Sequence, residues 1–378
     1  MAINIGQQPQ ELARSGNALT YTFTSDQTNQ DNFAYIVEVY KDGVIHSNHR
    51  VYPENGTYGR FDLSEIAEYE LTKPNIPSST YVDAGNYAEF YIIVKEFYGA
   101  IPVVGSTVST FQTVVWKAKQ SIFEPFDFSS FFPTPFGGSL LTYFYETTLY
   151  PEELLFLYAL KLQGDPYIHL DYRNSAGFTH YANDIGLAQY KCLGINLSYD
   201  FIESNYGGIG WTDTAYVLIT ITDGTDYYNE YRINIVHEEN CIKPTRLHWI
   251  NKLGGMDSFS FVKPTRQEQQ TNVESYQTST GVWFGTFYGQ QDDDTGNSTF
   301  QTESSKYLTL DSGFVSESEQ AIMYDNLMTS PYVLVEWEER LIRVSRDSVT
   351  VGYKSNKLDQ LFSVGIKINI ENFKSMIV

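Results

Sequence analysis

The sequence predicts a mainly β protein, with two antiparallel β-sandwich domains in tandem and a C-terminal β-meander that carries one short α-helix. Two observations predict this fold class. Short segments of alternating apolar and polar residues recur between turn-forming residues, which is typical of strands that bury one face. Tyrosine and phenylalanine, with 30 and 24 residues, are abundant, and both favour half-buried pleated surfaces.

Residues 1–120 make up the first predicted domain. Its segments with strand character are Asn17–Thr24, Phe33–Tyr40, Val44–Tyr52, Glu89–Phe97 and Thr107–Trp116. Several short strands with turns between them, over roughly 100 residues, indicate an antiparallel sandwich of immunoglobulin-like kind. We also expect a short helix within Phe61–Leu71, beginning at Asp62 or Ser64.

Residues 121–139 form a predicted linker that is rich in Phe, Pro and Ser and shows neither a helical nor a strand period. Its six phenylalanines need burial somewhere: Phe123, Phe126, Phe128, Phe131, Phe132 and Phe136. Two roles fit them. Either they tuck under the two flanking domains, or they form an arm that docks on a neighbouring subunit.

Residues 140–240 make up the second predicted sandwich. Within it, Tyr216–Thr222 and Tyr228–Val236 are expected to form a hairpin, because Asp223–Asp226 supplies turn residues between two alternating segments. The glycine-rich loop Asn205–Asp213 resembles a phosphate loop in composition alone. It lacks the Gly-Lys-Ser/Thr ending, so we predict no nucleotide site there.

Residues 241–378 form a β-rich C-terminal domain with a predicted helix near residues 316–329. Ser316 and Glu319 have the spacing of a capping box, and Ser330-Pro331 ends the helical pattern. The strands that follow should bury one face against this helix. Earlier in the domain, the acidic run at 292–294 lacks the ligand and glycine spacing of a calcium loop, so we expect a solvated hairpin tip.

The densest group of unusual residues lies in Cys241–Phe261. A strand that carries Trp249 runs into the Gly254-Gly255 pair and continues as an alternating segment, which indicates a hairpin. One interpretation is a catalytic group of Arg246, His248 and Asp257. The other is a structural brace at a domain junction, made by Arg246, Trp249, Asn251, Gly254, Gly255 and Asp257.

We favour the brace, because no nucleophile or cofactor motif lies near this hairpin. In this interpretation Arg246 and Asp257 are hydrogen-bonding partners that support the turn after Trp249. The expectation is that Trp249→Ala or Gly255→Val impairs folding or assembly and that His248→Ala has little effect. We predict no catalytic residue, no cofactor and no metal site in the chain.

Charge and cysteine content exclude several classes of protein. The formal net charge of −21 repels phosphate backbones, which argues against sequence-specific nucleic-acid binding. Cys192 and Cys241 are too far apart for a zinc knuckle and give no disulfide framework. The N-terminal segment has no basic start followed by an apolar run, and no apolar window is long enough to cross a bilayer. We expect a protein made in the cytoplasm.

At this point the order of parts resembles a virion structural protein of crAss-like and related short-tailed phages that infect Bacteroidetes. The resemblance is carried by the strand NFAYIVEVY, the following GRFDLSEI, the hairpin RLHWINKLGGMDSFSF, and the capped helix that ends LMTSPYVLVEW. The family's hairpin reads close to Trp-Leu-Asn-x-x-Gly-Gly-Phe-Asp. Trp249, Asn251, Gly254, Gly255 and Asp257 match this run, with Ile250 at the Leu position, while Met256 replaces its aromatic residue.

The resemblance implies a ring or hub component of the tail or head–tail connector, located in the virion and made in the host cytoplasm. It implies a cyclic homo-oligomer, with six- or twelve-fold symmetry expected, that contacts other tail or neck proteins and the portal. It implies no catalytic residues. An acidic lining would repel DNA and ease its passage, which fits the charge. The alternative is a receptor- or glycan-binding tail appendage, because Tyr and Trp are abundant.

Overall fold

The computed structural model describes residues 3–79, 81–100, 103–119, 137–163, 165–187, 191–206, 211–222, 227–237, 243–277, 281–289, 297–338, 340–346 and 362–376. The chain divides into two compact units. Unit 1 comprises Met1–Glu238 and Ile250–Ser258, and unit 2 comprises Glu239–Trp249 and Phe259–Val378. The hairpin singled out by its sequence therefore has its turn in unit 1 and most of its two strands in unit 2.

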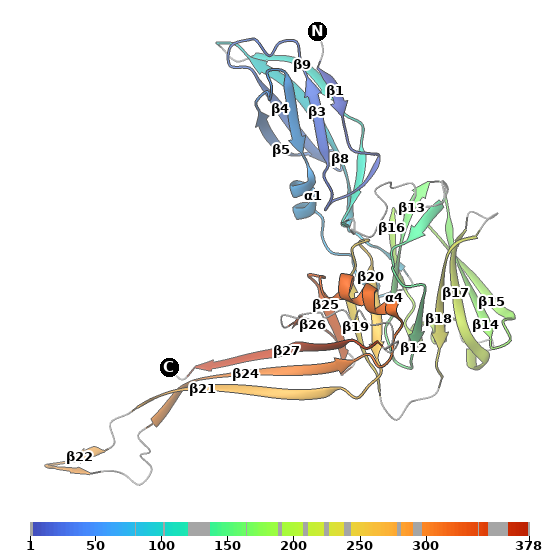
Figure 1. Cartoon of the computed structure of the whole chain (residues 1–378), viewed down its shortest axis with the longest axis vertical. Helices are drawn as coiled ribbons and strands as arrows, with labels where there is room; N and C mark the ends of the chain where they lie inside the picture. Colours follow the sequence, from blue (N-terminus) through green and yellow to red (C-terminus); the bar gives the residue numbers. More distant parts are fainter. Residues whose placement is uncertain are drawn as a thin grey trace. The chain divides into compact units, whose positions relative to one another are not determined.

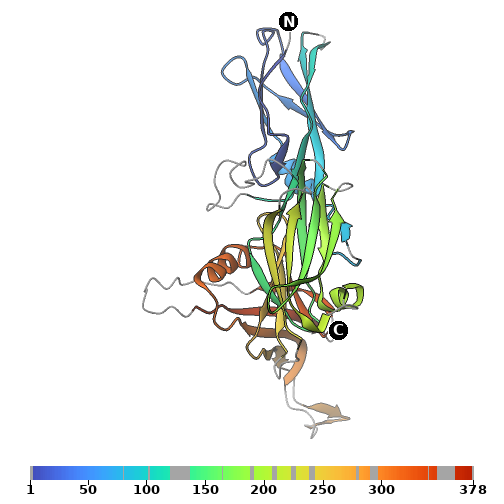
Figure 2. The ribbon, with the colours of Figure 1, turned by 90° about the vertical axis from the view of Figure 1, so that its right-hand side faces the viewer.

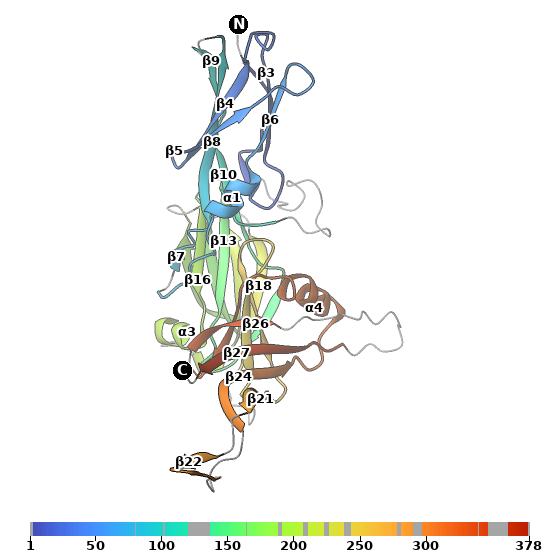
Figure 3. The same cartoon turned by 90° about the vertical axis from the view of Figure 1, so that its left-hand side faces the viewer.

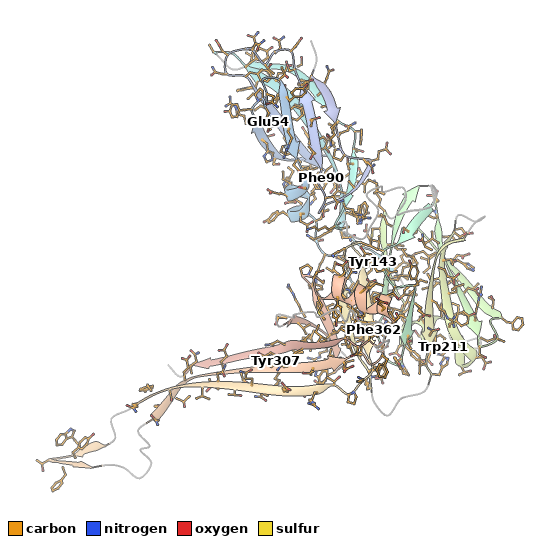
Figure 4. The ribbon with its side chains drawn as sticks, viewed as in Figure 1. Glu54, Phe90, Tyr143, Trp211, Tyr307 and Phe362 are labelled. Atoms are coloured by element: carbon orange, nitrogen blue, oxygen red, sulfur yellow. The ribbon has the colours of Figure 1, made fainter. Side chains whose placement is uncertain are left out.

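The first sandwich in unit 1 pairs a three-stranded sheet, β1-β3-β6, with a sheet of order β2-β10-β8-β4-β5 in which β9 joins β8. The strands are β1 Asn4–Gln7, β2 Leu12–Arg14, β3 Thr20–Thr24, β4 Ala34–Lys41, β5 Val44–Val51, β6 Tyr58–Asp62, β8 Tyr87–Tyr98, β9 Val103–Ser109 and β10 Thr113–Trp116. In β8 alternate residues are buried, among them Phe90 in the core (Figure 4), as the alternating sequence predicts. One edge pair, β2 with β10, is parallel.

Helix α1 (Ser64–Glu70) lies at one end of this sandwich (Figure 3). Asp62 positions its start, because the carboxylate Oδ1 accepts a hydrogen bond from the main-chain N–H of Ser64 at 2.9 Å and from that of Leu19 at 3.1 Å. The short helix expected within Phe61–Leu71 is therefore confirmed.

The second sandwich in unit 1 pairs a sheet of order β11-β13-β16-β7 with a sheet of order β12-β18-β17-β14-β15 (Figure 2, green strands). The strands are β7 Tyr81–Asp83, β11 Gly137–Leu140, β12 Glu146–Leu149, β13 Phe156–Gln163, β14 Tyr167–Asn174, β15 Thr179–Gly186, β16 Cys192–Asn196, β17 Thr214–Thr222 and β18 Tyr227–Ile235. The antiparallel pair β17–β18 is the hairpin that the sequence predicts, although its turn at 223–226 lies outside the described residues.

In two places the strand pairing of this sandwich does not follow the order of the strands in the chain. The edge strand β7 comes from the segment predicted as the first domain and pairs with β16. Strand β12 pairs with β18 in parallel. Two short helices, α3 (Tyr199–Tyr206) and η1 (Trp211–Asp213), lie between β16 and β17. The tandem, mainly β sandwich fold predicted from the sequence is confirmed.

Unit 2 is organised on a seven-stranded sheet of order β20-β19-β25-β26-β27-β24-β21. The strands are β19 Thr245–Ile250, β20 Met256–Phe261, β21 Arg266–Gln277, β24 Asn297–Asp311, β25 Val333–Trp337, β26 Arg340–Arg346 and β27 Gly365–Met376. A two-stranded hairpin of β22 (Val282–Phe284) and β23 (Phe287–Gly289) follows β21 in the chain. In Figure 1, β21, β24 and β27 run side by side as a ribbon with β22 beyond its far end.

The helix predicted near residues 316–329 is confirmed as α4 (Glu317–Ile322) continued by one π-helical segment, η2 (Met323–Leu327). Its capping box is formed: Glu319 N–H donates to Ser316 Oγ at 3.2 Å, and Ser316 N–H donates to Glu319 Oε2 at 2.8 Å. Met323 and Leu327 are buried. No helix in the described part of the chain is long and apolar enough to span a membrane.

Candidate functional site

The glycine turn, defined as residues Ile250–Ser258, is the best-defined polar site in unit 1. It contacts the first sandwich through hydrogen bonds to main-chain oxygens of the turn. Asn86 Nδ2 donates to the carbonyl of Gly254 at 2.8 Å, and Trp116 Nε1 donates to the carbonyl of Leu253 at 2.9 Å. Lys119 N–H donates to the carbonyl of Lys252 at 2.8 Å. These bonds fix the turn against the end of β10.

The same turn is also bound to the start of the second sandwich. Asn251 Nδ2 donates to the carbonyl of Leu141 at 2.9 Å, directly after β11. Thr142 Oγ1 donates to Asp257 Oδ1 at 2.6 Å. Because residues 251–257 bind both sandwiches within a few residues of each other, the glycine turn joins the two domains of unit 1. Tyr143, labelled in Figure 4, follows at this point of the chain.

Asn251 sets the shape of the turn as well as its contacts. Its side-chain Oδ1 accepts from the main-chain N–H of Leu253 at 3.0 Å and from that of Gly255 at 3.1 Å. Its own N–H donates to the carbonyl of Gly255 at 3.0 Å. Asparagine suits this position, because its short amide can bond its own backbone two to four residues on while still donating outward. Asn251 is buried, so these bonds are shielded from water.

The two glycines are required by close approach of the backbone. Gly254 has φ of +88°, and a Cβ added there would lie 2.3 Å from the carbonyl oxygen of Lys117. A Cβ on Gly255 would lie 2.1 Å from the carbonyl oxygen of Leu141. Both distances are far inside van der Waals contact, and both oxygens belong to the main chain. No side chain fits at either position without moving one of the two domains away from the turn.

Asp257 is a buried carboxyl group in this site. Burial raises the pKa of Asp257 to about 6, and hydrogen bonds from Thr142, from the Asn251 side chain and from the Tyr143 main chain act in the opposite direction. The ionised Asp257 carboxylate is therefore stabilised by three hydrogen-bond donors but destabilised by its burial away from water. Asp257 does not face a charged partner in this cluster, so its role is to accept hydrogen bonds between the turn and the second sandwich.

Trp116 links the glycine turn to the rest of the first sandwich. On its other side, the guanidinium of Arg14 lies 5.9 Å from the indole centroid, and both residues are buried. The next residue, Lys117, donates through Nζ to the carbonyls of Glu68 and Leu71, each at 2.8 Å, at the C-terminal end of α1. A cation there complements the free carbonyls and dipole of the helix. Sequence reasoning did not select Trp116 or Asn86.

Unit 2 holds the other residues of the predicted brace. Arg246 is fully buried and its Nη1 donates to Ser260 Oγ at 2.9 Å. Asp257 bonds to Thr142 instead. Arg246 and Asp257 thus each hydrogen-bond to a hydroxyl group, that of Ser260 and that of Thr142 respectively. The two side chains belong to different units, because the chain passes between units at Trp249 and Ser258. Trp249 is fully buried in β19, opposite Val333 of β25.

His248 requires a correction too. We expected it to be dispensable, but its side chain is fully buried and its Nε2 lies 2.5 Å from Glu336 Oε1 of β25. Removing the ring would leave a largely buried carboxylate without this partner, which is costly. The catalytic interpretation gains nothing from this geometry, because Arg246, His248 and Asp257 each bind a different group.

The remaining predicted sites have mixed outcomes. All six phenylalanines of the predicted docking arm lie outside the described residues, as do the acidic run 292–294 and Cys241. Cys192 is buried, and burial raises the pKa of its thiol, so it behaves as a small hydrophobic residue. Among the described residues no group of three or more His, Cys, Asp or Glu side chains is placed to hold a metal ion.

Comparisons with known proteins give fold likeness at most. No family model matches the chain, and no curated protein matches it. Similar solved structures include fibronectin(III)-like modules of Clostridium thermocellum CbhA, at 10% identity over 62% of this chain and 94% of that one, with a TM-score of 0.16. An Escherichia coli alpha-2-macroglobulin fragment is 7% identical over 80% and 93%, with a TM-score of 0.25.

The titin I-band fragment I67–I69 is 8% identical over 81% of this chain and 93% of that one, with a TM-score of 0.21. These neighbours are tandem β-domain proteins, and at such TM-scores they carry no argument about function. The functional argument therefore rests on the surfaces and contacts of this chain.

Proposed function

We propose that the chain is a non-enzymatic virion structural protein that forms a ring or hub of a phage tail or head–tail connector through which DNA passes. The observation that carries this proposal is the ribbon, defined as strands β21, β24 and β27 of unit 2. A sheet normally buries at least one face to be stable in water. In β21 every one of the 12 residues is exposed, so this edge strand of the ribbon is suited to a partner molecule and not to an internal core.

The ribbon is held together by polar groups. Lys367 Nζ lies 2.8 Å from Glu268 Oε2, and Gln269 Nε2 donates to Ser304 Oγ at 2.9 Å. Tyr307 of β24, labelled in Figure 4, has Lys367 Nζ at 4.6 Å from its ring centroid. Exposed polar pairs of this kind contribute little to stability, so the exposed strand β21 can gain further stability from contacts made on assembly.

The hairpin β22–β23 presents exposed aromatic side chains. Trp283 and Phe287 are 68% and 77% exposed, and the rings of Trp283 and Tyr288 pack edge-on with centroids 5.3 Å apart. Aromatic residues of this type are enriched among interface residues that dominate binding energy. A protein that binds its neighbours in a ring or hub needs exposed aromatic residues that are not already packed in its own hydrophobic cores.

The glycine turn supports the same proposal from unit 1. Five hydrogen bonds from the glycine turn reach the two sandwiches and join them within unit 1. The charge of −21 suits a passage for DNA, because an acidic lining repels the phosphate backbone. We infer a cyclic homo-oligomer, with six- or twelve-fold symmetry expected, that contacts other tail or neck proteins and the portal.

Electron cryo-microscopy of the phage whose genome encodes the chain tests this proposal. We expect density for the chain on the tail axis, as a closed ring, with acidic residues facing the channel. Placement of the chain in single fibres at the periphery would overturn it.

The exposed aromatic tip also favours a second candidate, a receptor- or glycan-binding tail appendage, because sugar rings stack on Trp and Tyr. Binding of the purified chain to host surface polysaccharide, lost in Trp283→Ala, would favour this alternative. No binding by the wild-type chain at millimolar polysaccharide would remove it.

A further inference from the structure

We propose that β21 pairs with β21 of a second copy of this chain, antiparallel and two-fold symmetric about Gln270. The proposal rests on the proposed function in one respect, since both treat the ribbon as an assembly surface, and it adds the identity of one partner and the register of pairing. Because the contact is two-fold, it joins copies from two rings and not neighbours within one cyclic ring.

Strand β21 has the properties of an edge that accepts another strand. It is the last strand of the seven-stranded sheet and pairs with β24, at the outer edge of the ribbon in Figure 1. Alternate main-chain N–H and C=O groups of an edge strand point away from the sheet. Proteins usually block such edges with lysine, proline or a short strand, but β21 has 12 residues and contains neither lysine nor proline.

The structure limits the regular part of this edge to nine residues. The ladder with β24 is continuous from Arg266 to Glu274, and a bulge follows between Glu274 and Ser275. A bulge bends the strand and ends regular pairing. The centre of the regular segment is Gln270, four residues from each end.

The charges at the two ends of this segment are opposite and self-complementary. With Gln270 facing its own copy, Arg266 of one chain lies opposite Glu274 of the other, and the reverse pair forms by symmetry. Glu268 then faces the neutral Asn272, and the two Gln270 amides can bond to each other.

Other registers lose this match. Sliding the strands by two residues in one direction places Glu268 opposite Glu274, which is repulsive and occurs twice by symmetry. Sliding them by two residues in the other direction places Arg266 opposite the neutral Asn272 and loses both ion pairs. A slip of one residue places Arg266 opposite Ser275 and forms no ion pair. The charges of β21 therefore select one antiparallel register, and they select a second copy as the occupant, because the strand complements itself.

The test uses the full chain and sedimentation velocity over a range of concentrations at low salt. Arg266→Glu and Glu274→Arg each place like charges opposite each other in the dimer. Both side chains are exposed, so both variants are expected to fold. Each should weaken self-association by about tenfold. Arg340→Glu, an exposed residue of β26 with the same change of charge as Arg266→Glu, should leave it unchanged.

The decisive experiment is to restore self-association with complementary charge changes. The double variant Arg266→Glu/Glu274→Arg restores both ion pairs, and so does an equimolar mixture of the two single variants, in which each chain carries the charges that the other lacks. We expect both samples to recover wild-type association. A folding defect would not be rescued by mixing. Failure of both rescues, unaltered association of the single variants, or a wild-type chain that stays monomeric would each overturn the proposal.

These outcomes are separable from those of the proposed function. If microscopy places the chain in a ring and the β21 variants associate normally, the strand pairing is wrong and the ring stands. If the charge rescue succeeds and the chain lies in peripheral fibres, the pairing stands and the ring is wrong.

Discussion

Two hairpins in this molecule end in turns that contain glycine, and their surroundings are opposite. In the glycine turn between β19 and β20, a Cβ on Gly255 would meet a main-chain oxygen at 2.1 Å. In the turn between β22 and β23, Gly285 has φ of +65°, and a Cβ there would meet nothing within 4 Å. The turn of the first hairpin is packed inside unit 1, while the second hairpin presents Trp283 and Phe287 to solvent. Similar local sequence signals therefore specify an internal joint in one place and an outward anchor in the other.

The largest expected effect comes from filling the space at the glycine turn. Gly255→Val should prevent folding of unit 1 or destabilise it by more than about 4 kcal/mol, because the carbonyl of Leu141 cannot yield without separating the turn from the second sandwich. Denaturant unfolding followed by circular dichroism measures this. The matched control is Gly186→Val, where a Cβ meets nothing within 4 Å and the change should be below about 0.5 kcal/mol. An equal loss of stability in Gly255→Val and Gly186→Val would contradict the close approach of the Leu141 carbonyl to Gly255.

A smaller loss is expected within the buried strands of the first hairpin. His248→Ala should lower the free energy of unfolding by about 3 kcal/mol, because it removes a buried ring and leaves Glu336 without its partner at 2.5 Å. His46→Ala makes the same change at an exposed ring that lies 3.7 Å from Glu70, and should cost less than about 1 kcal/mol. Thermal unfolding of both variants checks the difference. A His248→Ala protein as stable as wild type would restore our original expectation from the sequence.

The buried carboxyl group of the glycine turn should give a pH dependence. The pKa of Asp257 is about 6 when folded and 3.8 in its ordinary state, so between these pH values the folded chain binds more protons than the unfolded chain. Its contribution to stability is thus fully present below pH 4 and is lost as pH rises through 6, by up to about 3 kcal/mol.

Asp257→Asn should remove this slope between pH 4 and pH 7 while keeping an oxygen that can accept from Thr142. Urea unfolding at a series of pH values measures the slope in both proteins. Identical slopes would show that Asp257 ionises normally in the folded chain.

The smallest effect is expected at the exposed hairpin. Trp283→Ala should change the free energy of unfolding by less than about 0.5 kcal/mol, since the side chain is 68% exposed. Trp249→Ala, at a fully buried indole, should cost about 3–5 kcal/mol. Both values come from chemical denaturation. A large loss at Trp283 would mean that the tip packs on the chain itself and is not available to a partner.

The sequence predicted those parts of the fold that depend on local patterns. The apolar segment Glu89–Phe97 marked a strand, which the structure extends to Tyr87–Tyr98, and Ser316 with Glu319 marked the helix start. Strand β21 was not recognised, because both of its faces are exposed and no alternation results. The polar stretch it belongs to shows no period that indicates a strand.

The candidate site was predicted in part. Glycine pairs and Asn251 signalled a tight turn at a junction, and they lie there. The contact of Trp116 with Leu253 spans 137 positions in the sequence, and no pattern around Trp116 indicates it. The spacing of Arg246 and Asp257 along one hairpin does not indicate that Arg246 belongs to unit 2 and Asp257 to unit 1.

The bond between Asn86 and the carbonyl of Gly254 has a consequence for the order of events during synthesis. The two residues are 168 positions apart in the sequence. The Asn86 side chain in the first sandwich can therefore form this hydrogen bond only after a late portion of the polypeptide has been synthesised. Domains generally fold in turn as they leave the ribosome. A nascent chain that stops before residue 250 therefore holds Trp116 and Asn86 at an unfinished surface.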